Sequence, residues 1–299
     1  MITFRYHIVS IVAVFLALSV GVLFGATFID QSIVDGLEAT QERLGDRNEQ
    51  LRNRTLDLEG RNEQFQTFAG VTRDATVRGV LEGQPVVTIK FDGTSDQVLE
   101  SLTRTLDAAG ARLDGTLTLT EQLDMSADET RERLRAALDT SIENPEALSV
   151  ELARHVAEAL AGINPQVLPR LAEAGLIRGN VSLPALAEDA PAQEPGPGLP
   201  AVVVVGGEVS PTFNARVIVP VTRALAEQDI VTVVGVPGRT GATLQSLRSG
   251  DLRVVTVDGI EFAMGQSLVA LGLRGALDGQ FGRYGTGEGA TAAVPIPGP

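Results

Sequence analysis

The sequence predicts an N-terminal transmembrane helix and a coiled coil, followed by an α/β domain. The domain is expected to hold a mostly parallel, doubly wound sheet of about five strands with a helical insertion. Three observations lead to this fold class: an uncharged run at 8–29, a seven-residue leucine repeat from Leu37, and short apolar runs alternating with helical periods from Pro85. We expect an anchor at 1–30, a coiled-coil stalk at 31–70, an α/β domain at 83–285 and a flexible tail at 286–299.

The anchor is the uncharged run IVSIVAVFLALSVGVLFGATFI between Ile8 and Ile29. At about 1.5 Å per residue this helix is roughly 33 Å long, which matches the hydrocarbon core of a bilayer. The alternative is a cleaved signal peptide, whose apolar region is shorter, about 7–15 residues, and ends in a small-x-small site. Because the run is too long and matches such a site poorly, we expect an uncleaved signal-anchor.

The charges on either side of this run predict its orientation. Arg5 and His7 precede it, whereas Asp30, Asp35 and Glu38 follow it. The positive-inside rule places the basic flank in the cytoplasm. We therefore expect a single-pass protein of the cell membrane with its head outside, and an outer envelope layer stays open as an alternative location.

Small residues share one face of the anchor helix, because Ala13, Ala17, Gly21 and Gly25 recur every four residues. Gly21 and Gly25 form a G-x-x-x-G motif, which lets two helix backbones approach closely. These four residues are a candidate dimer face. The alternative is that glycine and alanine are simply common in membrane helices.

A heptad repeat follows the anchor. The d positions are apolar: Leu37, Leu44, Leu51, Leu58 and Phe65. The a positions are mostly polar: Val34, Gln41, Asn48, Thr55 and Asn62. Polar a positions cost stability but favour one register and two parallel strands. We expect a weak coiled coil that forms a parallel homodimer; the alternative is one amphipathic helix lying on its own head.

The spacing of apolar residues predicts the strands and helices of the α/β domain. We predict five strands, at 86–91, 112–119, 201–205, 230–236 and 252–257. Helices are expected between them at 96–109, 214–228 and 241–247, and a last apolar helix at 263–277. Three more helices at 127–142, 146–161 and 165–174 form the insertion, and 188–200 is a linker or surface loop.

Ligands of doubly wound sheets bind beyond the carboxyl ends of the strands. Asp92, Glu208 and Asp258 follow three of the predicted strands and are a candidate ligand or hard-metal site. The neighbouring glycines form neither a dinucleotide fingerprint nor a P-loop. The alternative is that these residues only build tight turns.

Composition excludes several functions. The net charge of −14 repels phosphate backbones, so we expect no nucleic-acid binding. The absence of cysteine excludes disulfides, zinc fingers and thiol nucleophiles. His7 flanks the anchor and His155 lies in a predicted helix, so neither is placed for triad chemistry and we expect no enzyme.

Both ends of the chain resemble one family. The N-terminus MITFRYHIVSIVAVFLALSVGVLFGATF and the segment VDGIEFAMGQSLVALGLRGALDGQFGRYG are similar to those of the mycobacterial copper transport protein B (MctB) family of actinobacteria. In that family a Gly-Gln pair, here Gly265 and Gln266, opens the last helix. A G-x-Y-G motif, here Gly282, Tyr284 and Gly285, ends the domain.

The resemblance implies a role in copper efflux or resistance, and relatives are also described as scaffolds that control envelope remodelling in division. Cu(I) prefers sulfur and imidazole ligands, yet the chain has Met1, Met125 and Met264, two histidines and no cysteine. Two hypotheses follow: copper transport without a bound cofactor, or a dimeric scaffold that holds an envelope or division protein.

Overall fold

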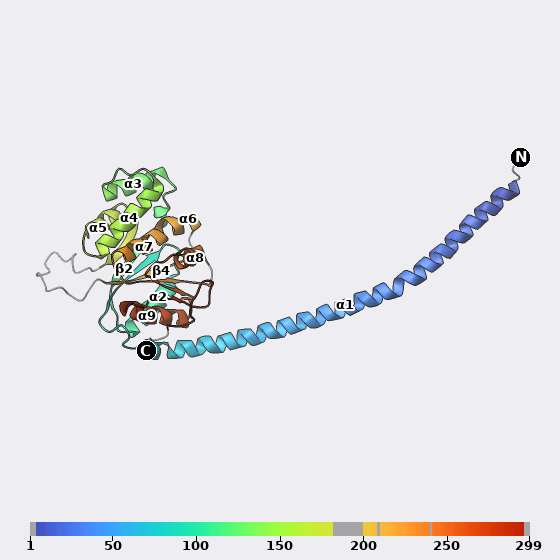
Figure 1. Cartoon of the computed structure of the whole chain (residues 1–299), viewed down its shortest axis with the longest axis horizontal. Helices are drawn as coiled ribbons and strands as arrows, with labels where there is room; N and C mark the ends of the chain where they lie inside the picture. Colours follow the sequence, from blue (N-terminus) through green and yellow to red (C-terminus); the bar gives the residue numbers. More distant parts are fainter. Residues whose placement is uncertain (1–3, 182–199, 208–209, 240, 296–299) are drawn as a thin grey trace, which may run out of the picture. The chain divides into compact units, whose positions relative to one another are not determined.

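The computed structural model describes residues 4–181, 200–207, 210–239 and 241–295. The chain divides into two compact units, Met1–Phe65 and Gln66–Pro299. Helix α1 (Phe4–Val77) begins in the first unit and ends in the second (Figure 1). It has no proline, and glutamate, arginine, glutamine and leucine are good helix formers, so nothing in its sequence forces a break.

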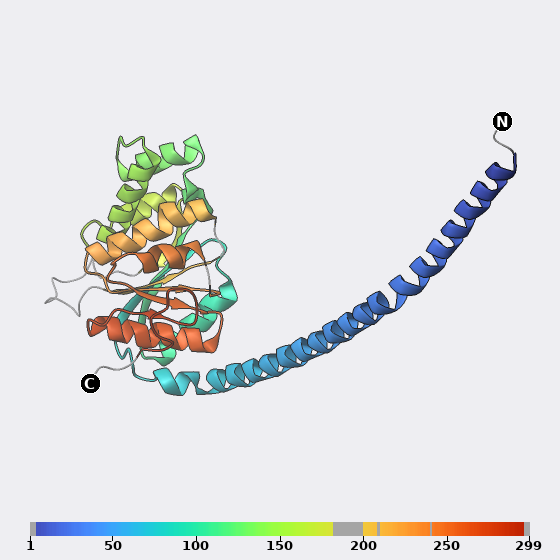
Figure 2. The ribbon, with the colours of Figure 1, turned by 45° about the vertical axis from the view of Figure 1, so that its right-hand side comes forward.

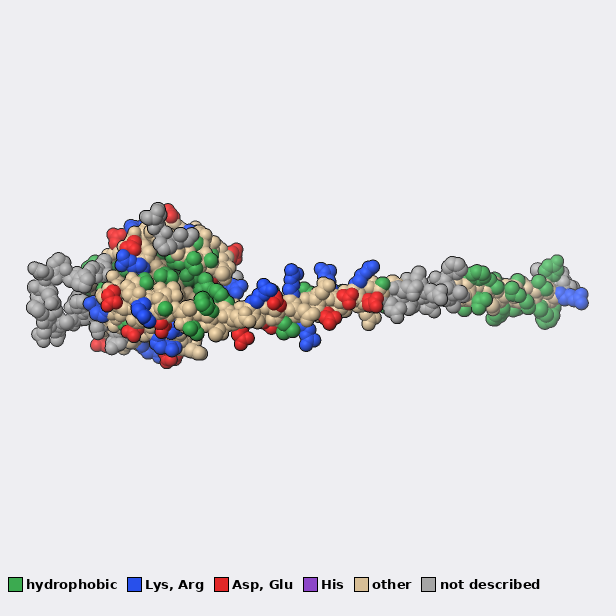
Figure 3. All heavy atoms as spheres, turned by 90° about the horizontal axis from the view of Figure 1, so that it is seen from below, with side chains coloured by type: hydrophobic (Ala, Val, Ile, Leu, Met, Phe, Trp, Pro, Cys, Tyr) green, Lys and Arg blue, Asp and Glu red, His purple; other side chains and the backbone are tan. Residues whose placement is uncertain are grey.

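The apolar end of α1, Phe4–Gly25, is a candidate membrane span, and none of its apolar stretch is buried. Figure 3 shows hydrophobic side chains gathered there and mixed charges farther along the helix. The d-position side chains are exposed, from 67% at Leu37 to 48% at Phe65. The predicted helix is therefore present, and its apolar stripe faces solvent in the single chain.

The second unit is built on one seven-stranded sheet with the order β3-β2-β1-β4-β5-β6-β7. Every pairing is parallel except that of β2 with β3. The strands are β1 Pro85–Phe91, β2 Arg112–Leu119, β3 Ile177–Val181, β4 Ala201–Val205, β5 Thr232–Val236, β6 Val255–Asp258 and β7 Arg283–Tyr284.

The mostly parallel α/β sheet is confirmed, but the predicted count of about five strands is too low. The two additional strands lack the signal used to predict the others. Strand β3 reads IRGNV, with polar residues and a glycine in place of an apolar run, and β7 has only 2 residues. Both are edge strands of the sheet, so each pairs with a neighbouring strand on one side only.

Helices cover both faces of the sheet (Figures 1 and 2). Helices α2 (Asp96–Ala108) and α9 (Ala263–Leu277) enclose one core cluster together with Val77 at the end of α1. The other cluster lies under the remaining longer helices: α3 Asp128–Leu138, α4 Pro145–Leu160, α5 Val167–Glu173, α7 Val219–Glu227 and α8 Ala242–Ser249.

The predicted helical insertion lies between β2 and β3 and comprises the 3-10 turn η1 (Glu121–Asp124), α3, α4 and α5. Asn144 caps α4 by accepting a hydrogen bond from the amide of Ala147 at 2.9 Å, and Pro145 follows at the first helical position. A short helix α6 (Pro211–Phe213) and a π-helical turn at Asn214–Ile218 lead into α7.

Candidate functional site

Two of the predicted carboxylates, Asp92 and Asp258, lie at the carboxyl edge of the sheet but do not meet. Asp92 follows β1 and Asp258 ends β6, with β4 and β5 between them. Three strand spacings of about 4.8 Å separate these strands by roughly 14 Å. Glu208 lies outside the described residues. Among the residues that the structure describes, no group of three His, Asp or Glu side chains is arranged to hold a metal ion.

Asp92 is engaged by its neighbours on the β3 side of the sheet. Its carboxylate pairs with Arg178 and accepts a hydrogen bond from the amide of Glu121 at 3.3 Å. These contacts tie the end of β1 to the edge strand β3 and to the start of η1. They give Asp92 a structural role.

Asp258 forms a buried ion pair with Arg248 from α8, with 3.0 Å between Nη2 and Oδ2. Each side chain is only 2% exposed. Asp258 also accepts from the amides of Thr286 at 2.9 Å and Gly287 at 3.0 Å. A buried charge is stable only when it is paired and hydrogen-bonded, and this carboxylate is both.

The partners of Arg248 lie on β6, on β7 and on the segment after β7. The guanidinium donates to the carbonyl oxygens of Tyr284 at 2.9 Å and Glu288 at 2.8 Å, and to Thr256 Oγ1 at 3.0 Å. The segment from Thr286 to Ala292 is thus held to the sheet, with an isolated bridge between Tyr284 and Ala292. The sequence predicts a flexible tail from residue 286, because neither the isolated Arg248 nor the glycines of this segment form a pattern that indicates such an attachment.

The family's closing motif surrounds this ion pair. Gly282 leaves room for the ring of Tyr284, and Gly285 (φ +123°) leaves room for the carboxylate of Asp258. A side chain at either glycine would clash, and the positive φ at Gly285 is costly for other residues. Burial raises the pKa of the Tyr284 hydroxyl.

The switch point of the sheet, where strand order reverses between β1 and β4, is closed by backbone contact. A Cβ on Gly207, after β4, would lie 3.0 Å from the backbone and Oγ1 of Thr94, after β1. Beside this contact, Lys90 Nζ lies 2.8 Å from Asp96 in the first turn of α2, and it lowers the pKa of that carboxyl. Gly207 therefore serves the close packing of the loops after β4 and β1.

The Gly-Gln pair of the family motif lies where α9 begins. A side chain at Gly265 would clash with the carbonyl group of Gly259 in the β6–α9 loop. Gln266 is 2% exposed, and its Oε1 accepts from Ser101 Oγ at 2.9 Å and Thr105 Oγ1 at 3.4 Å on α2. Its Nε2 donates to the carbonyl oxygen of Ile260 at 3.1 Å.

Arg73 connects the last turns of α1 to this glutamine. Its Nη1 lies 3.4 Å from both Gln266 Oε1 and Ser101 Oγ, and its side chain is 15% exposed. We name the cluster of Arg73, Ser101, Thr105 and Gln266 the stalk joint. The sequence offered no sign of Arg73, because one arginine in a polar helix looks solvated.

The soft copper ligands of the described residues lie in separate places. Met125 is fully buried in the core cluster under α3, α4 and α7, whereas Met264 packs against the cluster on the opposite face of the sheet. His155 lies on α4 beside Glu151, with 3.3 Å between Nε2 and Oε1, and beside Arg154 at 3.1 Å. Met1 lies outside the described residues.

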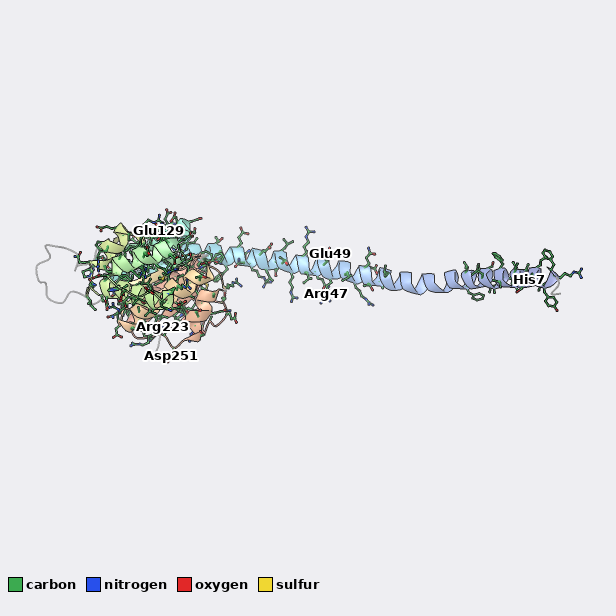
Figure 4. All side chains as sticks on the ribbon, turned by 90° about the horizontal axis from the view of Figure 1, so that it is seen from above. His7, Arg47, Glu49, Glu129, Arg223 and Asp251 are labelled. Atoms are coloured by element: carbon green, nitrogen blue, oxygen red, sulfur yellow. The ribbon has the colours of Figure 1, made fainter. Side chains whose placement is uncertain are left out.

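The predicted dimer face of the anchor is open in the single chain. Ala13 and Ala17 are exposed, and a Cβ added at Gly21 or Gly25 would meet nothing within 4 Å. Figure 4 places His7 at the same end of α1 and Arg47 and Glu49 on the charged stretch that carries the heptads.

The chain thus joins an apolar N-terminal helix, long and apolar enough to span a membrane, to an α/β domain with a mostly parallel sheet. Residues 1–295 match the family described as "Copper transport outer membrane protein, MctB", and the chain belongs to this family. The proteins named "Copper transporter MctB" in Mycobacterium tuberculosis and Mycobacterium bovis are each 28% identical to it, over 98% of this chain and 99% of the relative. That of Mycobacterium leprae is also 28% identical, over 98% of both chains.

Proposed function

We propose that this chain is a single-pass envelope protein that acts as a dimeric, non-catalytic scaffold, and that its part in copper efflux or resistance runs through its partners. The observation that carries the proposal is helix α1, which joins a candidate membrane span to the α/β domain without interruption. A continuous helix suits a device that holds a head at a membrane. The N-terminus is cytoplasmic and the head is outside, as the flanking charges favour.

The dimer is supported by two separate patterns on α1. The small-residue face of the anchor and the exposed d-position side chains of the stalk would both be covered by a second copy. Two anchors in one membrane start on the same side, so only a parallel pair keeps both patterns in register. Confinement to the bilayer raises the effective concentration and offsets the weak, polar a positions.

The contacts of the candidate site favour a scaffold over direct ion handling. The two described carboxylates of the predicted metal site are each paired with an arginine. Met125 and Met264 lie on opposite faces of the sheet, so they cannot share one Cu(I) ion. We infer that any effect on copper tolerance is indirect.

Direct copper transport is the second candidate, because the relatives carry that name. Complementation of a deletion strain on copper separates the two. In the scaffold case, the triple variant Met125→Leu, Met264→Leu, His155→Gln restores tolerance, whereas Leu44→Asp with Leu51→Asp does not. The opposite pattern would favour transport. Leucine is close to methionine in volume, so the triple variant should keep its fold.

A pull-down from membranes identifies the partner of the scaffold. The full chain and the Leu44→Asp, Leu51→Asp variant serve as paired baits. A partner captured by the first and lost with the second supports a scaffold that works as a dimer. Equal capture by both baits would contradict it.

A further inference from the structure

Gln266 stands between two sets of hydrogen bonds that lie on different parts of the head. Its oxygen faces the last turns of α1 and helix α2, where it accepts from Arg73 and Ser101. Its nitrogen faces the loop between β6 and α9, where it donates to the carbonyl oxygen of Ile260. Because the oxygen and nitrogen belong to one planar amide, a rotation that alters the hydrogen bonds of the oxygen also alters that of the nitrogen.

The contacts continue from Ile260 to the loop after β5. The amide of Ile260 donates to the carbonyl oxygen of Val236 at 3.3 Å, and the amide of Gly259 donates to that of Gly238 at 3.0 Å. The amide of Gly238 in turn donates to the carboxylate of Glu261, at 3.0 and 3.1 Å. An unbroken line of hydrogen bonds therefore runs from α1 to the carboxyl edge of β5.

Tight packing keeps this line stiff. Gly265 touches the backbone of Gly259, and a Cβ at Gly235 would lie 2.9 Å from the side chain of Ile260. Movement of α9 at its first turn must therefore displace the β6–α9 loop, since packed interiors transmit displacement with little compression.

We propose that the stalk joint is a relay: a shift of the last turns of α1 reaches the loops at Gly238 and Gly259 through Gln266. The relay gives a membrane-anchored head a means to report a load or a bound partner on the stalk at the far edge of its sheet. It does not depend on the oligomeric state, so it is testable apart from the proposed function.

Hydrogen exchange of the full-length protein in nanodiscs tests the relay, with peptides covering 66–77 and 236–262. Arg73→Ala is expected to raise exchange several-fold in both regions, because Gln266 loses one donor and its amide is freed to turn. The matched control is Arg78→Ala, which changes an exposed arginine just after α1. This variant should leave hydrogen exchange at the ends of β5 and β6, within 236–262, unchanged. Faster exchange at 66–77 alone in Arg73→Ala would overturn the relay.

Reciprocity supplies a second, independent measurement. Coupling between two sites acts equally in both directions. Glu261→Gln weakens the contact with the Gly238 amide at an exposed position, so it should raise exchange at 66–77 as well as locally. An effect confined to 236–262 would contradict the proposal, even if Arg73→Ala proved too disruptive to interpret.

Discussion

Arg248 and Asp258 form an ion pair 3.0 Å long that is almost fully buried at the end of β6. The pair does more than neutralise two charges, because both partners also bind the backbone between Tyr284 and Glu288. The carboxyl end of β6 is thus covered by the chain's own C-terminal segment.

Removing one partner of this pair should be strongly destabilising. We expect Asp258→Ala to lower the free energy of unfolding by about 3–5 kcal/mol, because Arg248 would stay buried without its counter-charge. The double variant Asp258→Ala, Arg248→Met should recover part of the loss. Urea unfolding of the purified chain measures both. An Asp258→Ala protein as stable as wild type would show that this carboxylate is not structural.

The outcome at Asp258 shows which part of the site a sequence can predict. Its place at the carboxyl end of a strand was correctly inferred, as were the approximate positions of β1, β2, β4, β5 and β6, because short apolar or alternating runs between helical periods mark strands. Its partner was not, because Arg248 lies in a short helix with no local pattern that marks it as buried. Long-range pairing of single residues leaves no periodic signal.

The limits of α1 were harder to predict for a similar reason. One helix was expected to carry the anchor and the heptads and to end near residue 70, whereas α1 runs to Val77. Its last turns pack on the head through Arg73 and Val77, a polar and an apolar residue that belong to neither repeat. Tertiary packing holds these last turns to the head, and Gly79 (φ +72°) follows the end of the helix.

Gly265 should not tolerate a side chain. We expect Gly265→Ala to destabilise the head by about 1–3 kcal/mol, because its methyl group would overlap the backbone of Gly259. The matched control is Gly70→Ala in α1, where a Cβ meets nothing within 4 Å. That change should be neutral or raise stability by about 0.5–1 kcal/mol. Thermal unfolding would contradict this account if both variants behaved alike.

Stability on α4 should depend on pH through Glu151. Arg154 lowers the pKa of this carboxyl from its ordinary value of 4.5, chiefly by donating hydrogen bonds to it. A carboxyl whose pKa is lower in the folded state stabilises the protein at pH values above its unfolded-state pKa. This stabilisation is lost as the pH falls through the folded-state pKa. Glu151→Gln should therefore be less stable than wild type at pH 7, with the gap closing below about pH 4.5.

The control for this experiment is Glu129→Gln, an exposed residue at the start of α3 (Figure 4). Because it removes the same charge, it corrects for net charge alone. A stability gap for Glu151→Gln that stayed constant from pH 7 to pH 3 would show that the ion pair with Arg154 does not contribute through its charge.

Topology has its own test. An alkaline phosphatase fused after residue 299 should be active, because the basic flank of the anchor is expected to stay in the cytoplasm. The control is the same fusion with Arg5 changed to Asp and three arginines added after Ile29, which should reverse the orientation. A cytosolic reporter that is active at the wild-type C-terminus would contradict the proposed orientation.

The central claim is that α1 holds two copies in parallel, and disulfide cross-linking in membranes tests it most directly. The natural chain has no cysteine, so each introduced thiol is unique. Leu44→Cys, on the apolar stripe, should cross-link to itself efficiently, and Asn53→Cys, on the opposite face, should not. Adding Gly21→Leu and Leu51→Asp to Leu44→Cys should abolish the cross-link. Equal cross-linking at positions 44 and 53 would contradict the parallel dimer and leave α1 as a single helix.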